Sequence, residues 1–152
     1  MGIIRKLMSS TAPRAVVLIR LAVGAVFLSE GIQKFLFPGD PDRGAARFAK
    51  IGLPEPEFLA SFVASFEVVC GALILLGLLT RLAVIPITVI MVVAIMTTKI
   101  PILVDRGFWD MAHAARTDFA MLLGSVFLLA VGAGPWSVDS AVSRANRVGV
   151  AG

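Results

Sequence analysis

Cysteine is almost absent from this sequence, in which Cys70 is the single example among 152 residues. A lone cysteine excludes an intramolecular disulfide, a CxxC redox pair and a cysteine-rich metal site within the chain. The sequence also lacks a dinucleotide-binding fingerprint, a CxxCH haem-attachment motif and a Met-x-x-Met array. We therefore expect no metal site and no intrinsic cofactor, so that redox chemistry would require a bound molecule or a partner protein.

Charge is also scarce. Charged residues make up 16% of the chain and hydrophobic residues 58%, and the mean hydropathy is +0.92, whereas about 25% of residues are charged in ordinary soluble domains. This composition argues against a water-soluble monomer. The net charge is +4, but the basic residues are scattered among apolar segments, which argues against nucleic-acid binding and favours contact with membrane lipids.

The hydrophobic residues are concentrated in four segments, and about 20 apolar residues suffice for one helix to cross a bilayer. The predicted spans cover residues 15–37, 58–79, 82–98 and 119–134. The very short Thr80-Arg81 connection makes the second and third spans antiparallel neighbours. The sequence therefore predicts an all-α fold, a bundle of four transmembrane helices that forms one domain over residues 1–152.

Two predicted loops connect these spans on the outer side. Residues 38–57 contain RGAARFAKIGL, and residues 100–117 contain FWDMAHAAR, in which Trp109 suits the headgroup boundary. We expect a short interfacial helix in each loop, and a loosely ordered tail from residue 137 onward. Most acidic loop residues fall in these two loops, which favours a cytoplasmic location for both termini.

Charged residues inside the predicted spans are the main candidate functional residues. Arg20, Glu30 and Lys34 lie in the first span and Glu67 near the centre of the second, where a charge costs on the order of 2.5–3.5 kcal/mol. Helical periodicity places Arg20 and Lys34 in one stripe with Glu30 on its flank, so we predict a polar network of these four residues. The network is either a structural staple or the lining of a pocket for a polar headgroup or a proton path.

Other candidates carry weaker signals. His113 could carry a proton or bind a metal, although a single histidine in an interfacial loop usually does neither. Cys70 among apolar residues is typical of a small, unreactive packing residue. Asp118 is well placed to favour a helix N-terminus.

Four segments of the chain resemble the DoxX family of small four-helix membrane proteins. They are RLAVGAVFLSEGIQK from Arg20, EVVCGALILLGLLTR from Glu67, MVVAIMTTK from Met91, and ARTDFAMLLGSVFLLAVGAGPWSVD from Ala115. The resemblance implies a bundle in the bacterial inner membrane, with relatives described as subunits of thiosulfate:quinone oxidoreductase or of membrane-associated redox complexes. The residues of this chain that match the family pattern at its polar positions are Arg20, Gly31, Lys34, Glu67, Thr80 and Arg81.

Two departures from the family pattern leave secondary candidates in doubt. Asp118 stands where many relatives have glutamate, which shortens the carboxylate. A histidine often expected after the third span is out of register, because Lys99 occupies that region and His113 comes later. Arg81, Lys99, His113 and Asp118 are therefore secondary candidates.

Three function hypotheses follow. The first is an inner-membrane subunit of a redox or oxidative-stress complex that binds a quinone or lipid at the charged cluster, at most as part of a quinone-linked oxidoreductase. The second is a non-catalytic scaffold that anchors soluble partner proteins. The third is a small transporter, which would need a homo-oligomer because a single four-helix bundle lacks the usual internal repeat.

Overall fold

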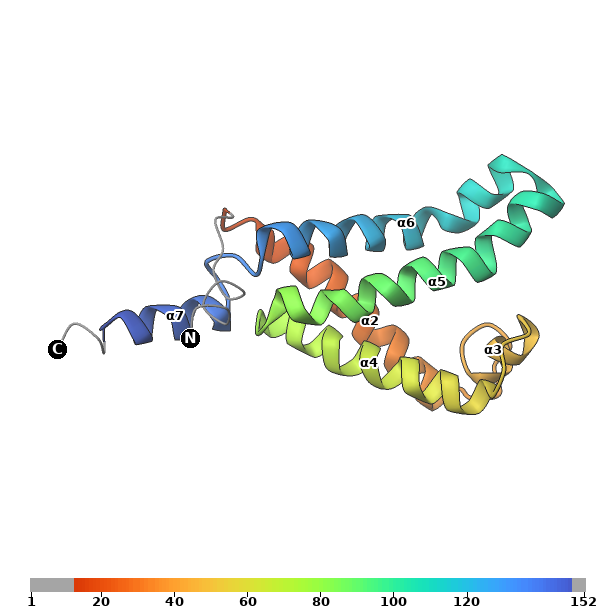
Figure 1. The fold of residues 1–152 in the computed structure, drawn as a ribbon, viewed down its shortest axis with the longest axis horizontal. Coiled ribbons are helices and arrows are strands. Elements are labelled where there is room, and N and C mark those ends of the chain that lie inside the picture. Colours follow the sequence, from red (N-terminus) through yellow and green to blue (C-terminus); the bar gives the residue numbers. More distant parts are fainter. Residues whose placement is uncertain (1–12, 149–152) are drawn as a thin grey trace.

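The structure is a computed structural model that describes residues 13–148. Four long helices make up most of it (Figure 1): α2 (Val16–Leu36), α4 (Pro56–Leu76), α5 (Thr80–Arg106) and α6 (Phe108–Val131). Each is long and apolar enough to cross a membrane, and no strand occurs among the described residues. These findings confirm the predicted all-α fold with four candidate membrane spans.

Helices α2 and α4 pack closely because small residues line their contact. A Cβ atom built on Gly31 would lie 2.8 Å from the backbone oxygen of Ala64 and 2.8 Å from the backbone nitrogen of Val68. Gly24 and Gly71 make a similar close approach nearer the middle of the pair. The two helices can therefore bring polar side chains on their facing sides into direct contact.

Replacing Gly31 with alanine should destabilise the protein by about 1–3 kcal/mol, because the added methyl group forces α2 away from the α4 backbone. Gly39→Ala is the matched control, since a Cβ atom there meets nothing within 4 Å. Thermal unfolding in detergent measures both variants. Equal melting of Gly31→Ala and wild type would show that the close α2–α4 approach is wrong.

Helices α5 and α6 form a hairpin in which Gly107 alone separates them, with φ 89° and ψ 178°. The expected polar loop over residues 100–117 is therefore wrong: α5 continues through Pro101 to Arg106, and FWDMAHAAR forms the first turns of α6. The physical reason is tertiary packing, because α6 pairs with α5 along this stretch and offsets the helix-breaking effect of proline. With 27 residues, α5 is about 40 Å long, which exceeds the thickness of a hydrocarbon core of about 30 Å.

The first loop contains the short helix α3 (Ala45–Lys50), as expected there. Helix α3 packs beside the segment that follows α2. The Ala46 amide donates a hydrogen bond to the Pro38 carbonyl at 3.1 Å, and Phe48 is buried. A position of α3 in the headgroup layer stays a prediction.

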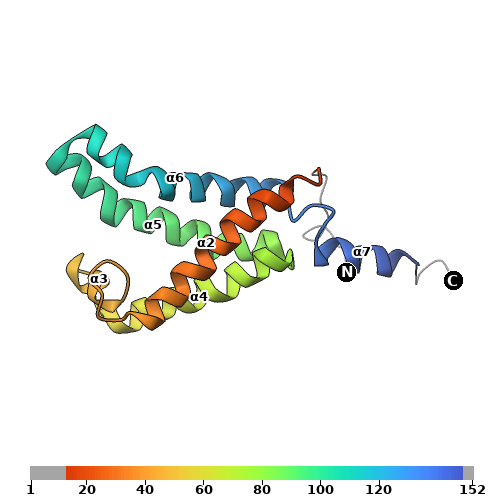
Figure 2. The same ribbon diagram turned by 180° about the vertical axis from the view of Figure 1, so that it is seen from behind.

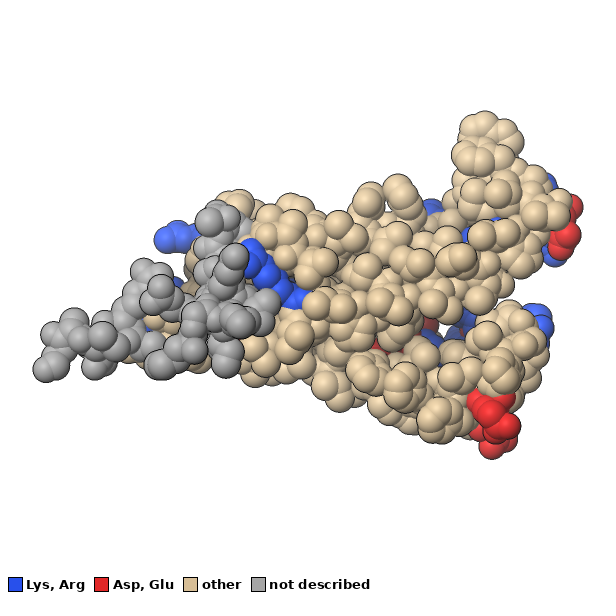
Figure 3. Space-filling model, in the orientation of Figure 1, with Lys and Arg blue, Asp and Glu red and all other residues tan. Residues whose placement is uncertain are grey.

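The helices are arranged as two pairs, α2 with α4 and α5 with α6 (Figures 1 and 2). The pairs meet at the end where α2 and α5 begin, and they splay apart toward α3 and the hairpin tip. The core lies in the closed part and includes Val23, Phe27, Ile74, Ile87 and Leu128. Figure 3 shows that the open part is hollowed, with charged atoms inside it.

The expected loose tail is helical over much of its length. Helix α7 (Val138–Val148) extends away from the closed end of the bundle (Figure 1). Residues 149–152 lie outside the described part of the chain.

Candidate functional site

Lys34 is the centre of a cluster of charged side chains at the last turn of α2. Its Nζ atom lies 2.7 Å from Oε2 of Glu67 on α4 and 3.6 Å from Oε2 of Glu30 one turn earlier on α2. The Lys34 and Glu67 side chains are 9% and 5% exposed, whereas that of Glu30 is 48% exposed. The cluster thus joins a buried ion pair to a carboxylate that faces open space.

The local structure explains why these side chains meet. Side chains in a helix lean toward its N-terminus, so Lys34 reaches back toward the level of Glu30, where Gly31 lets α4 approach closely. Glu67 lies on the buried face of α4. Arg47 of α3 also interacts electrostatically with the Glu67 carboxylate, so three elements contribute charge to the cluster.

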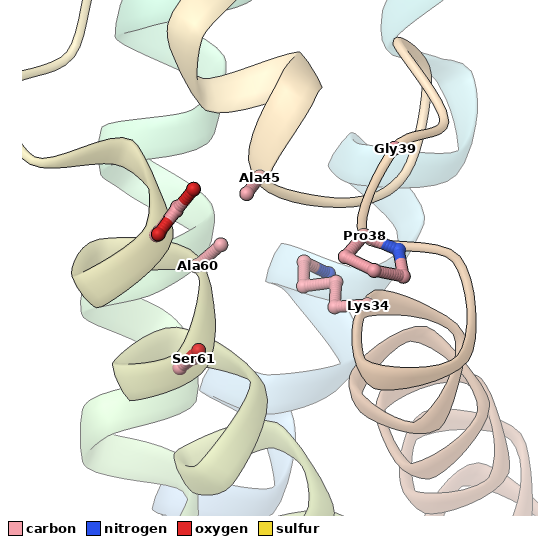
Figure 4. A pocket seen from close by; sticks show the side chains of 7 residues that line it. Lys34, Pro38, Gly39, Ala45, Ala60 and Ser61 are labelled. Atoms are coloured by element: carbon pink, nitrogen blue, oxygen red, sulfur yellow. The ribbon is translucent and has the colours of Figure 1, made fainter.

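A pocket of about 420 Å³ adjoins the cluster between α2, α3 and α4 (Figure 4). It is lined by Lys34, Pro38, Gly39, Ala45, Glu57, Ala60 and Ser61. Figure 4 shows Lys34 on one side of this space, Ala60 and Ser61 on the other, and Ala45 at the start of α3 beside it. Helix α3 therefore forms part of the pocket wall, and the Lys34 amine is a cationic donor at that wall.

Arg20 lies outside this cluster, which corrects the predicted four-residue network. Its Nη1 and Nη2 atoms donate hydrogen bonds of 2.7 Å to the carbonyls of Ala133 and Trp136, beyond the end of α6. Ten residues of helix, about 15 Å, separate Arg20 from Glu30. The last carbonyls of a helix lack partners within it, and the forked guanidinium of Arg20 satisfies two carbonyls of this connecting segment.

Sequence reasoning missed Asp139. Its carboxylate is buried and accepts hydrogen bonds from the amides of Leu79 at 2.8 Å and Thr80 at 3.4 Å. Burial raises the pKa of Asp139, and the two amide bonds and nearby Arg20 oppose that rise. The available signal was the short α4–α5 turn, which leaves the first amides of α5 without helical partners.

The secondary candidates lie apart from the Lys34 cluster. Lys99 and Asp118 form an ion pair of 3.0 Å between α5 and α6. Arg81 donates a hydrogen bond of 2.9 Å to the Ala130 carbonyl across the same hairpin. His113 is exposed near the tip, where Nη1 of Arg116 lies 2.6 Å from its Nε2 atom. In the described part of the chain, no group of three or more metal-ligating side chains could hold a metal ion.

Comparison with known proteins places this helix bundle in a family. The DoxX family model matches residues 15–100. A protein of Mycobacterium tuberculosis, the uncharacterized membrane protein Rv3486, is 50% identical over 145 residues, which cover 91% of this chain and 88% of the relative. The chain belongs to the DoxX family. This confirms the resemblance inferred from the sequence and confirms that the chain is a membrane protein.

The part of this DoxX protein that the family model matches runs from the start of α2 through most of α5. It therefore includes the whole Lys34 cluster, whereas His113 and Asp118 lie beyond it. A second relative, from Bacillus subtilis, bears the name "Putative oxidoreductase CatD" and is 28% identical over 135 residues, covering 87% of this chain and 90% of its own. No solved structure matches this chain.

Proposed function

We propose that this DoxX protein is an inner-membrane subunit of a redox complex that binds a quinone at the Lys34 pocket. The observation that carries the proposal is that Lys34, which forms a buried ion pair with Glu67, lines a pocket of about 420 Å³. Ligand pockets usually measure about 300–1,000 Å³ and combine apolar walls with a few polar groups. The name of the B. subtilis relative supports the redox part of the proposal.

The residues around the pocket fit the head of a quinone. The Lys34 ammonium donates hydrogen bonds, and a ring carbonyl would accept one. Glu67 and the half-exposed Glu30 hold carboxylates close to the same atom, where they orient the ammonium. A bound quinone supplies an acceptor for two electrons and two protons. The electrons would come from a partner protein, consistent with a subunit role.

The open side of the bundle supports entry from the membrane. The helix pairs splay apart near the cluster, and Figure 3 shows charged atoms within the hollow. A lipid-soluble molecule can approach laterally between the pairs, with its tail among apolar side chains. An intramembrane charge marks a ligand or proton path by default, and this geometry favours an amphipathic ligand.

A scaffold is the second candidate function, and the α5–α6 hairpin is the observation that favours it. Helix α5 is longer than a helix needs to be to cross the hydrocarbon core, and the tip of the hairpin exposes Val104 and Trp109, the latter to 81%. An exposed apolar tip of this kind suits a soluble partner protein. The transporter hypothesis has no comparable observation.

The quinone proposal predicts a ligand that depends on the Lys34–Glu67 pair. Wild-type protein, extracted gently from its own membranes, should carry a quinone detectable by mass spectrometry and should melt at a higher temperature with added quinone. The double variant Lys34→Met with Glu67→Gln removes the donor and both charges together, which preserves folding better than removing one partner. It should lose both the ligand and the thermal shift.

The matched control is Lys99→Met with Asp118→Asn, which removes an ion pair from the other helix pair and should retain both signals. If wild-type protein carries no bound quinone and shows no thermal shift, the quinone proposal is wrong and the scaffold becomes the better-supported function. A stoichiometric phospholipid in place of quinone would assign the pocket to a lipid headgroup.

A further inference from the structure

The closed end of the bundle differs from the open end in its charge. Among the described residues, Asp139 is the acidic residue at the end where α2 and α5 begin, and its carboxylate is buried. The acidic residues of the loop and the hairpin tip lie toward the other end. Figure 3 shows the red atoms of the visible outer surface at the end opposite α7. Among the described residues, the charged side chains exposed at the closed end are therefore cationic.

Two of the arginines at this end donate hydrogen bonds within the protein. Arg20 is buried against two carbonyls, and Arg81 donates to the Ala130 carbonyl. Asp139 binds the first amides of α5, so its carboxylate does not neutralise the surface. Arg14, just before α2, and Arg144, on α7, remain exposed.

Trp136 lies beside Arg14 at this end. The guanidinium carbon of Arg14 is 5.9 Å from the centroid of the Trp136 ring, which is 60% exposed. Arg14 lies two residues before α2 begins and Trp136 five residues after α6 ends, so both adjoin ends of candidate membrane spans. Tryptophan is enriched at this boundary, where its ring reaches the level of the headgroups. Arg144 lies six residues after the start of α7, about 9 Å along that helix from Val138.

We propose that Arg14, Trp136 and Arg144 form a docking surface for anionic phospholipid headgroups. The arginine fork matches phosphate oxygens in a bidentate arrangement, and the tryptophan ring packs at the glycerol level. The occupant is a lipid because Arg14 and Trp136 adjoin the ends of two membrane spans, where headgroups surround the protein. This surface is separate from the Lys34 pocket and does not depend on the function proposed for it.

The test uses Trp136 as its own reporter. The chain has two tryptophans, so Trp109→Phe at the hairpin tip leaves Trp136 as the single fluorophore. In nanodiscs of phosphatidylcholine, added phosphatidylglycerol should produce a saturable change in Trp136 emission, and further phosphatidylcholine should not. The Arg14→Gln and Arg144→Gln double variant should raise the half-saturating phosphatidylglycerol fraction roughly 25-fold, about fivefold per arginine. Arg14→Lys with Arg144→Lys should restore most of the response, because the charge is kept.

The matched control is Arg106→Gln with Arg116→Gln, which removes the same charge from the hairpin and should leave the half-saturating fraction unchanged. An equal rise of the half-saturating phosphatidylglycerol fraction in this control would overturn the proposal, because the response would then depend on net charge alone. Equal responses to both lipids would overturn it too and would leave the cationic end facing an acidic protein. Complete competition by inorganic phosphate would make it a free-phosphate site instead of a lipid surface.

Discussion

Replacing Lys34 with methionine should lower the free energy of unfolding by about 3–5 kcal/mol, because the Glu67 carboxylate would stay buried without its partner. Glu67→Leu should cost less, since Lys34 keeps the Glu30 carboxylate one turn away. Glu67→Gln should cost less than Glu67→Leu, because the amide oxygen still accepts a hydrogen bond from Lys34. Unfolding of the detergent-solubilised protein measures all three.

A double-mutant cycle separates the ion pair from general damage to the bundle. If Lys34 and Glu67 act as one pair, the Lys34→Met and Glu67→Leu double variant should be more stable than the sum of the two single losses predicts. Additive losses, or single variants that melt with wild type, would show that Glu67 faces lipid or water. The Lys99→Met and Asp118→Asn variant reports on an ion pair elsewhere in the membrane region.

The sequence predicted the four spans because long apolar runs and turn residues are local signals. It also predicted that Lys34, Glu30 and Glu67 lie together, since helical periodicity places the first two on one side of α2 and the small residues of α4 mark its contact face. Those inferences need only one helix at a time and the assumption that α2 and α4 are neighbours. The ligand-binding role of the cluster stays a prediction.

The sequence did not predict what depends on contacts between distant segments. Arg20 shares the α2 stripe with Lys34, but the carbonyls of Ala133 and Trp136, more than 110 residues away, bind it instead. The hairpin was missed for a similar reason. Pro101 and Lys99 have the local character of a helix end, and only the packing of α6 beside α5 shows that the helix continues.

The separation of Arg20 from the cluster divides the buried charges into two groups. At the closed end, Arg20 joins α2 to the segment after α6, and Asp139 joins the start of α7 to the α4–α5 turn. The open end contains the pocket and the half-exposed Glu30. The two sets of charges therefore lie in different halves of the bundle, so their contributions to stability can be tested independently.

Replacing Arg20 with methionine should lower the free energy of unfolding by about 3–6 kcal/mol, because two hydrogen bonds from a charged donor are lost, each worth about 1.5–3 kcal/mol. The buried Asp139 also loses nearby positive charge. Hydrogen exchange should quicken at the Asp139 amide, which donates to the Gly77 carbonyl. The free energy of unfolding of Arg20→Lys should lie between those of wild type and Arg20→Met, since the lysine ammonium lacks the forked guanidinium that spans two carbonyls.

The Arg20 variant also decides between one intramembrane network and two. About 15 Å of helix lies between Arg20 and Glu30, so losses from Arg20→Met and Glu67→Leu should add within about 0.5 kcal/mol. Arg20→Met should further leave ligand retention at the Lys34 pocket intact in whatever fraction remains folded. Strong coupling between Arg20 and Glu67 would instead mean that a single network runs along α2. The stability of the closed end would then depend on what binds at the open end.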